Sequence, residues 1–436
     1  MKKKSLGQIR EIVSSEGFKE RHRSEARYFS RVRILTLRVV IMMILRKGMK
    51  SLQLALNEVL GKLSLPLVSK SAYSQARQHL KHTAFIELNR EGIVKVYYEE
   101  GEEERFWGMR VLGIDGSNVI LPDNKAIYEA FGKIRRTSGK KGKKGEGYYS
   151  YAQASVLYDV LNKIAIDSLF AESSAYEVDL AEQHLAYTQE GDLLVCDRNY
   201  ASYRWLATLV HHQRGFVIRC QRNSFKPVQA MFAGEGADSQ IVTLSVPPGK
   251  VKEIRQRRLP NKIKVRLIRV TLSDGSYEVL VTNLLDEKAY PTADFSHLYQ
   301  LRWGVETFYQ RLKTRLTLEN FSGYSVEAVK QDFFAAVFLT GLETILTQDA
   351  QAQLRQRSAT TRHTYQVNNA VAFNAIKNHA FELLFADIDI DVLLDKLTKL
   401  FLTDPSCIRP ERRVPHRQPN YYKRYVFHRH KRKDCF

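Results

Sequence analysis

The stretch from Phe106 to Cys220 most constrains the fold, because its apolar runs and helical segments follow an order that few architectures allow. Three strand-like segments come first, then a helix, a strand, a second helix and a final strand. The segments that define this order read MRVLGID, YYSYAQASVLYD, NKIAIDSLFA, SAYEVDLAEQHLAYTQ, DLLVCD, SYRWLATLVHHQ and GFVIRC. Asp115 ends the first strand and Asp197 ends the fourth. The pattern predicts an α/β domain with two carboxylates at the edge of a sheet, where a ligand can reach them.

Each aspartate also has an ordinary explanation. Asp115 precedes Gly116, and Asp-Gly is a favoured hairpin dipeptide, so we expect the chain to turn there into a second strand-like piece, NVILP. The sequence DRNY at Asp197 is a plausible turn as well. Taken together, the two aspartates are more informative than either alone. The order of the strands that they follow matches a ribonuclease-H-like mixed sheet flanked by helices.

A third carboxylate lies in the stretch YQLRWGVETFYQRLK, from Tyr299 to Lys313. At about 100° per residue, a helix would place Tyr299, Arg302, Glu306 and Lys313 on one narrow stripe. Leu301, Val305, Phe308 and Leu312 would then form the buried face. The alternative is a solvated helix surface with a common ion pair between Arg302 and Glu306.

The charge of the chain points to a polyanionic partner. It has 68 Lys and Arg against 47 Asp and Glu, which gives a net charge of +21. DNA is the expected partner, because neutralising phosphates releases counterions. The apolar run from Val39 to Leu45 is too short to cross a bilayer, so we expect no membrane partner. The start has no apolar segment typical of a secretory signal, and the four cysteines form no CxxC pair, which favours a reducing cytoplasm.

Changes in composition predict five regions. They are a helical DNA-binding domain (1–105), the first part of the catalytic core (106–220), a β-rich insertion (221–292), the core helix that completes the site (293–325), and a helical C-terminal region with a basic tail (326–436). In the first region Ser69 is a predicted N-cap of SKSAYSQARQHL, whose Ser71, Gln75, Arg77 and Gln78 are candidate DNA contacts. Two basic segments, the loop from Lys133 to Gly147 and the tail from Arg409, are further candidates for phosphate contact.

Three convergent carboxylates predict a site for two Mg²⁺ ions, since Mg²⁺ prefers oxygen ligands. Two such ions about 3.5–4 Å apart can activate an attacking hydroxyl and stabilise the leaving oxygen of a phosphoryl displacement. Arg302 and Lys313 are then candidates to contact phosphates beside the reacting bond, and Tyr299 to donate to a phosphate or stack near a base.

These residues resemble a known family. The spacing Tyr299-x2-Arg302-x3-Glu306-x6-Lys313 resembles the YREK signature of DDE transposases of the insertion-sequence-four type, and LENFSG follows it as in that family. GIDGS at Asp115 and CDRNY at Asp197 resemble the two aspartate motifs. The resemblance implies a cut-and-paste transposase that acts through a hairpin on the terminal inverted repeats of its element and on target DNA, in association with the nucleoid of a prokaryote. Asp115, Asp197 and Glu306 would bind two Mg²⁺, for which Mn²⁺ can substitute, within a homodimer.

One departure from the family concerns base stacking. The resemblance implies a tryptophan in the insertion, but the tryptophans here are Trp107, Trp205 and Trp303, all outside it. Tyr277 and Phe225 are candidate substitutes, and the stacking residue stays unassigned. Two other functions share part of the pattern: a transposase-derived DNA-binding protein without catalysis, and a metal-dependent nuclease of ribonuclease-H type.

Overall fold

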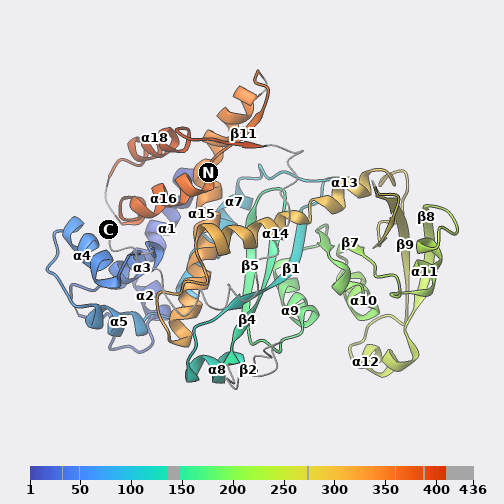
Figure 1. Cartoon of the computed structure of the whole chain (residues 1–436), viewed down its shortest axis with the longest axis horizontal. Coiled ribbons are helices and arrows are strands. Elements are labelled where there is room, and N and C mark those ends of the chain that lie inside the picture. Colours follow the sequence, from blue (N-terminus) through green and yellow to red (C-terminus); the bar gives the residue numbers. More distant parts are fainter. Residues whose placement is uncertain are drawn as a thin grey trace, which may run out of the picture. The chain divides into compact units, whose positions relative to one another are not determined.

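The structure, a computed structural model, describes residues 1–31, 33–48, 50–135, 148–272, 274–358, 360–385 and 388–408. The chain, drawn in Figure 1, divides into two compact units. The first comprises residues 1–102, 119–152 and 310–436, and the second 103–118 and 153–309. Most of the predicted basic loop, from residue 136 to 147, and the basic tail from Arg409 lie outside the described residues.

A mixed sheet of eight strands organises the second unit, in the order β5-β4-β1-β6-β7-β10-β9-β8. Its strands are β1 (Val111–Ile120), β4 (Tyr151–Asp159), β5 (Ile164–Ala171), β6 (Leu193–Cys196), β7 (Gly215–Arg219), β8 (Ser239–Ser245), β9 (Lys262–Thr271) and β10 (Tyr277–Thr282). β1, β6 and β7 are parallel to one another, and β4 pairs with β5 as an antiparallel hairpin. This arrangement of the first five strands confirms the predicted ribonuclease-H-like fold.

Strand β1 runs through the position where the sequence predicted a turn. It extends from Val111 to Ile120, and Asp115 lies in its middle rather than at its end. The predicted turn at Gly116 is therefore wrong, and NVILP begins within the same strand. The strand is buried before and after the aspartate, because Ile114 and Val119 are both fully buried.

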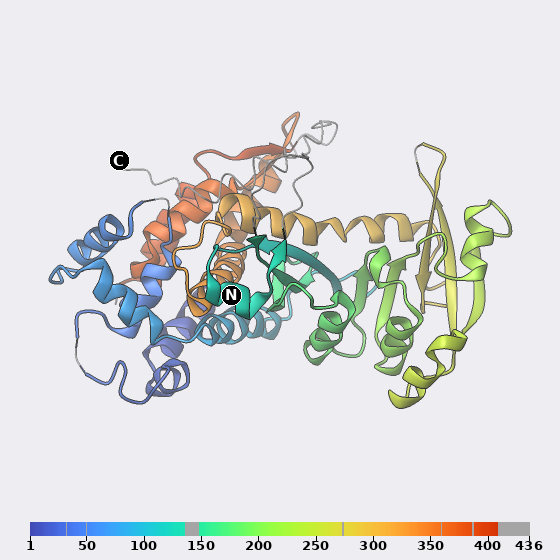
Figure 2. The ribbon, with the colours of Figure 1, turned by 60° about the horizontal axis from the view of Figure 1, so that its bottom comes forward.

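The strands of the predicted insertion extend the core sheet and do not form a separate one. β10 pairs antiparallel with β7 through Leu280 and Arg219, and β9 and β8 follow outward. Figure 2 shows β8 and β9, drawn in yellow-green and yellow, side by side at this edge. The insertion thereby continues the sheet that carries Asp115 and Asp197.

Helices complete the second unit. They are α9 (Glu177–His184), η2 (Leu185–Tyr187), η3 (Arg198–Tyr200), α10 (Tyr203–His211), α11 (Lys226–Phe232), η4 (Pro248–Lys250), α12 (Val251–Gln256), α13 (Asp294–Gln300) and α14 (Trp303–Gln310). α14 lies directly on β1, since a Cβ atom on Gly113 would collide with the side chain of Val305. Gly304 similarly faces Val160, whose Cβ would lie 3.3 Å from an added methyl. These glycines let the helix approach the strand closely, two residues before Asp115.

The first unit is mainly helical. Its elements are α1 (Lys2–Ser14), α2 (Glu16–His22), α3 (Leu37–Leu45), α4 (Leu52–Lys62), α5 (Lys70–Gln78), α6 (Thr83–Asn89), η1 (Arg90–Val94), α7 (Lys95–Glu99), α8 (Lys125–Phe131), η5 (Arg311–Arg315), α15 (Val326–Ser358), α16 (Asn369–Asn378), α17 (Ala380–Leu384) and α18 (Ile390–Phe401), with the strand pairs β2 (Ile134–Arg135) and β3 (Tyr148–Tyr149), and β11 (Thr364–Gln366) and β12 (Ser406–Ile408). α15 carries the apolar stretch VKQDFFAAVFLTGLETIL, and Phe333 and Phe338 on it are buried. The predicted cap is confirmed, because Ser69 accepts a hydrogen bond from the backbone N–H of Ala72.

One candidate DNA contact in α5 is wrong. Ser71, Gln75 and Gln78 are exposed, but Arg77 is buried. Its Nη2 lies 2.8 Å from Oδ1 of the fully buried Asp332 on α15, and its Nε donates to Gln331. Arg77 thus holds α5 against α15, with only 5% of its surface exposed.

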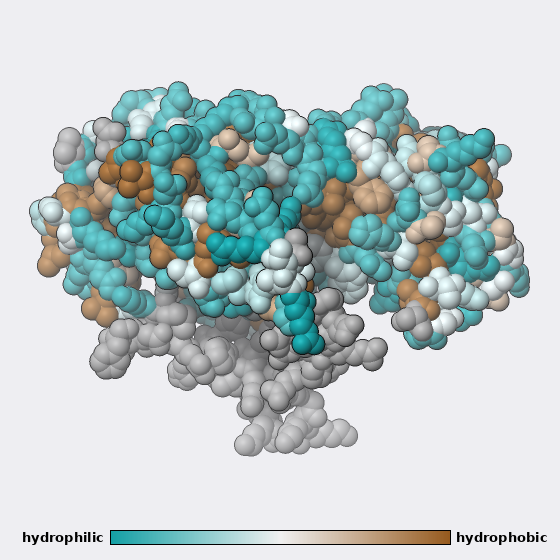
Figure 3. Space-filling model, turned by 90° about the horizontal axis from the view of Figure 1, so that it is seen from above, coloured by the Kyte–Doolittle hydropathy of each residue, from teal (hydrophilic) through white to brown (hydrophobic). Residues whose placement is uncertain are grey.

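The face shown in Figure 3 is mostly hydrophilic, with apolar residues exposed in smaller patches. Among the helices described, none is both long enough and apolar enough to cross a membrane.

Candidate active site

Asp115 and Asp197 meet through the pairing of β1 with β6. Ile114 is the register partner of Cys196, so the two aspartates occupy the next positions of adjacent parallel strands. Such strands lie about 4.8 Å apart, which brings the two carboxylates together. Backbone amides orient both side chains: the N–H of Gly116 donates to Asp115 Oδ1 at 2.8 Å, and that of Asn199 donates to Asp197 Oδ1 at 2.8 Å.

Glu306 comes from α14, whose buried face fixes its position. Val305 and Phe308 are fully buried, and the Phe308 ring packs 4.9 Å from that of Tyr158. The hydroxyl of Tyr309 donates to the backbone carbonyl of Asp115 at 3.1 Å. These contacts leave Glu306 on the open side of the helix, with its side chain 43% exposed.

The guanidinium of Arg302 lies between two of the carboxylates. Its Nη2 donates to Glu306 Oε1 at 2.9 Å, and its Nη1 is 3.9 Å from Asp115 Oδ2. The face of the guanidinium also lies 4.8 Å from the ring of Trp303. Arg302 is therefore the cation that balances this acidic site in the structure.

The stretch from Tyr299 to Lys313 is not the single helix that the spacing predicted. α13 ends at Gln300, Leu301 and Arg302 form a turn, and α14 begins at Trp303. Lys313 lies in the π-helical turn η5. Tyr299 is only 6% exposed, and burial raises the pKa of its hydroxyl. The predicted apolar face is correct for Val305, Phe308 and Leu312, which are buried, whereas Leu301 is half-buried.

The electrostatics of Asp115 are those of a crowded acidic site. Burial raises the pKa of Asp115 to about 7, and the charges of Asp197 and Glu306 act in the same direction. The N–H of Gly116 and the charge of Arg302 oppose the increase in pKa. The ionised site therefore favours binding of additional positive charge.

A first prediction concerns Asp115→Asn in protein kept free of metal. Because the folded-state pKa is raised above its unfolded value near 3.8, stability present at low pH is lost as the pH rises towards about 7. The full difference corresponds to about 4 kcal/mol, which solvent screening reduces to about 1–3 kcal/mol. We expect the variant to melt at a higher temperature than the parent at pH 8 and at a similar one at pH 4, measured with a chelator present. If the variant and the parent melt at equal temperatures at both pH 4 and pH 8, the raised pKa of Asp115 is contradicted. The control is Glu190→Gln, which changes an exposed carboxylate.

The residues fit a hard divalent cation in donor chemistry, since three carboxylates offer the oxygen ligands that Mg²⁺ prefers. Within the described ranges, however, no three His, Cys, Asp or Glu side chains stand close enough together to hold a metal ion. Glu306 is drawn towards Arg302 instead. A shared metal site would require that ion pair to open.

Sequence reasoning missed Glu177, a fourth carboxylate at this site. It opens α9, accepts a hydrogen bond from Gln153 Nε2 at 3.1 Å, and would lie 2.9 Å from a Cβ on Gly116. Burial, and then the charge of Asp197, raise the pKa of Glu177. The sequence signal was an acidic residue in the first turn of a predicted helix, which is too common to single out.

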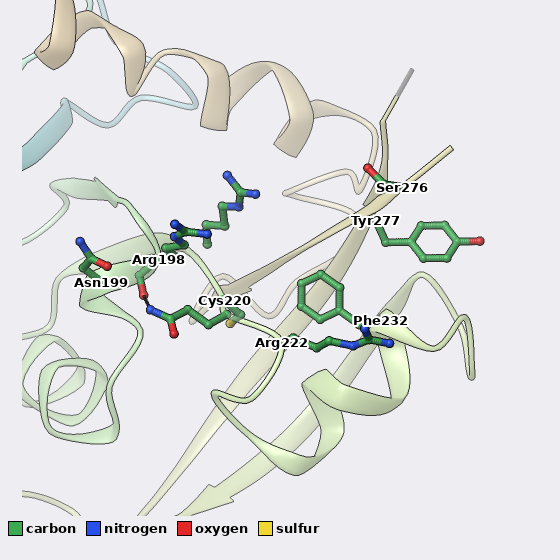
Figure 4. A pocket seen from close by; sticks show the side chains of 9 residues that line it. Arg198, Asn199, Cys220, Arg222, Phe232, Ser276 and Tyr277 are labelled. Carbon is green, nitrogen blue, oxygen red and sulfur yellow. Dashed lines mark hydrogen bonds between the residues drawn. The ribbon is translucent and has the colours of Figure 1, made fainter. Parts of the chain in front are cut away.

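A basic pocket opens beside Arg198 and Asn199, as Figure 4 shows, and these two residues directly follow Asp197 in the chain. It has a volume of about 680 Å³ and is lined by Arg198, Arg219 and Arg222 together with Phe232 and Tyr277. Tyr277 is 37% exposed. Phe225, the other aromatic candidate, caps α11 and does not line this pocket.

The chain is similar in sequence to known proteins. Residues 106–341 match the model of a family described as the transposase DDE domain. Among curated proteins, the chain is 23% identical over 285 residues to transposase InsG for insertion sequence element IS4 of Escherichia coli K12, covering 64% of this chain and 61% of that protein. It is 22% identical over 233 residues to the putative transposase y4zB of Sinorhizobium fredii, covering 53% and 57%. The match thus spans less than two thirds of each relative.

A solved structure of a piggyBac transposase synaptic complex with hairpin DNA aligns with 91% of this chain and 82% of that one. The TM-score is 0.42 and the sequence identity 10%, which is too weak a likeness to indicate function.

Proposed function

Since the chain belongs to the transposase DDE domain family, we propose that it is a DNA transposase that cleaves the ends of its own insertion sequence and joins them to target DNA. Its substrates would be the terminal inverted repeats, bridged by a homodimer. One observation carries the proposal: Asp115 lies beside Asp197 and within 3.9 Å of an arginine that also pairs with Glu306. This proximity supports the proposal that the two aspartates act together with Arg302 and Glu306.

The proposed roles follow from this arrangement. Asp115, Asp197 and Glu306 would bind two Mg²⁺, or Mn²⁺ in their place, which would activate the attacking oxygen and stabilise the leaving one. Arg302 would leave Glu306 and donate to a phosphate beside the reacting bond, because its planar guanidinium binds phosphate as readily as carboxylate. Lys313 would contribute a second positive charge to the strand. Tyr299, being buried, would support the position of Arg302, whose guanidinium lies 5.7 Å from its ring.

The direct test is to incubate the purified protein with a duplex that carries the inverted repeat flanking its gene. We expect Mg²⁺-dependent cleavage at the repeat end, and then a hairpin and joined products. If the protein binds the duplex but does not cleave it with Mg²⁺ or Mn²⁺, the catalytic proposal is contradicted. That result would favour a DNA-binding protein without catalysis.

A second prediction concerns the base displaced during hairpin formation. Trp303 is 54% exposed, lies three residues before Glu306 and contacts Arg302, so we propose it as the stacking residue. Stacking of a base on an aromatic ring contributes about 1–3 kcal/mol. Trp303→Ala is therefore expected to lower hairpin yield by about tenfold, with first-strand cleavage nearly unchanged.

The matched comparison is Tyr277→Ala, in the basic pocket of Figure 4. Fluorescence of 2-aminopurine at the terminal base reports unstacking separately from cleavage. If Tyr277→Ala loses more hairpin yield than Trp303→Ala, the stacking residue is Tyr277 in the pocket and not Trp303.

A further inference from the structure

The first unit contains a cationic groove that none of the roles above uses. It has a volume of about 900 Å³ and lies among three regions far apart in the sequence: α3 to α5, the loop from Thr317 to Ser325, and α16. We call it the α4–α16 groove. All of its lining residues belong to the same compact unit.

The floor of the groove is held by a buried ionic network. Asp332 is fully buried and binds Arg77 at 2.8 Å, with Lys47 at 3.7 Å. It also accepts from the backbone N–H of Ser322. Lys47 in turn donates to the carbonyls of Thr317 and Leu318. This network ties the loop to the N-terminal helices and to α15, so the groove is preformed and loses little entropy when it binds a ligand.

The lining carries more positive charge than its own acids neutralise. The six cations around it are Arg46, Lys47, Lys50, Arg77, Arg315 and Lys377. The lining itself carries one carboxylate, Glu58, which pairs with Lys50 at 2.6 Å, while the buried Asp332 beneath it pairs with Arg77. Within the described ranges, neither Arg46 nor Arg315 forms an ion pair with a carboxylate. Both therefore remain available to an anion.

Lys377 adds to this field from a more buried position. Its Nζ donates to the backbone carbonyl of Lys47 at 2.8 Å. Burial, and then the charge of Lys47, lower the pKa of Lys377 to about 8, while Asp332 opposes the decrease. An anion in the groove would relieve this repulsion.

We propose that the α4–α16 groove binds the sugar-phosphate backbone of duplex DNA, with Arg46 and Arg315 each contacting a phosphate. The assignment rests on the proposed function, which supplies DNA as the polyanion. Amide side chains at the rim, Gln78, Asn374 and Asn378, can donate to phosphate and sugar oxygens. The chain's own tail is an unsuitable occupant, because it is strongly basic. Gln78, at the exposed end of α5, would face the DNA in this groove, whereas the buried Arg77 would not contact it directly.

The test is the double variant Arg46→Ala/Arg315→Ala in the full chain, with fluorescence anisotropy on a labelled duplex at several salt concentrations. Each phosphate contact contributes about 0.9 to the slope of log K against log salt, so we expect the slope to fall by about 2. Affinity at physiological salt should fall by about tenfold or more. Arg357→Ala/Arg362→Ala is the matched control, because it removes the same charge from exposed positions of the same unit. Charge reversal, Arg46→Glu/Arg315→Glu, should enlarge the loss while the circular dichroism stays that of the parent.

The outcomes separate the groove from the proposed function. If both double variants lose affinity equally, or neither does, while the parent binds and cleaves DNA, the groove assignment is overturned and the transposase function stands. If the parent binds no duplex at any salt concentration, the proposed function itself fails. A polyglutamate of matched charge is the competing probe: Arg46 and Arg315 dependence seen for it and not for DNA would assign the groove to an acidic protein segment.

Discussion

Replacing Glu306 with alanine is expected to lower the rate of Mg²⁺-dependent strand cleavage by at least about a thousandfold while DNA binding is retained. Metal ions supply several kcal/mol of stabilisation to a phosphoryl-transfer transition state, and about 4 kcal/mol corresponds to this factor. Glu306 would provide one of the three carboxylates that hold them. Asp115→Ala and Asp197→Ala should lower the cleavage rate by a similar factor.

The structure explains why binding should survive these changes. Glu306 is 43% exposed and, within the described ranges, pairs only with Arg302, so its removal leaves α14 packed through Val305 and Phe308. Loss of a negative charge beside the substrate should leave DNA affinity unchanged or slightly higher, because phosphate repulsion decreases. Arg302 is freed at the same time, but it cannot replace an oxygen ligand.

The measurement is a single-turnover cleavage assay beside a binding curve on the same duplex. Glu190→Ala, an exposed carboxylate of the same unit, is the matched control and should cleave like the parent. Full activity in Glu306→Ala would show that α14 does not complete the site. Equal loss of binding and cleavage would instead indicate a structural role.

Replacing Arg77 with methionine is expected to destabilise the first unit by about 3–5 kcal/mol. The change removes a fully enclosed guanidinium and leaves Asp332, which is 0% exposed at its side chain, with Lys47 as its remaining cation at 3.7 Å. Removing one partner of a buried ion pair has this cost because it leaves an unpaired buried charge. The intact pair itself contributes little net stability. The carboxylate depends on its partners: burial opposes ionisation, yet Lys47, Arg77 and Ser322 hold the pKa of Asp332 below its usual value.

Thermal unfolding measures the effect, and we expect the melting temperature of this unit to fall by about 10 °C. The double variant Arg77→Met/Asp332→Leu should recover part of the loss, since no unpaired charge remains. Lys50→Met breaks the exposed pair with Glu58 and is the control, with an expected change of at most about 1 kcal/mol. A loss in Arg77→Met no larger than in this control would mean that Arg77 acts at the surface, as the sequence first suggested.

Local patterns predicted much of the fold. The capped start of α5, the strand order from β1 to β7, and the buried stretch of α15 all follow from residues close together in the chain. Those patterns are short-range: a cap needs three residues, and an apolar run needs only its own side chains. Asp115 was misplaced for the same reason, because Asp-Gly favours a turn locally, while in the structure β1 continues through it as one strand to Ile120.

The sequence by itself predicted, through order and spacing, which side chains would carry the proposed chemistry: Asp115, Asp197 and Glu306, together with Arg302 and Lys313. Only the tertiary structure decided what these residues contact. It placed the guanidinium of Arg302 between Asp115 and Glu306, added Glu177, buried Arg77 against Asp332, and gathered Arg46, Arg315 and Lys377 into one groove. The physical reason is that charges act on each other through space. The packing of segments hundreds of residues apart sets these distances, and no local pattern encodes them.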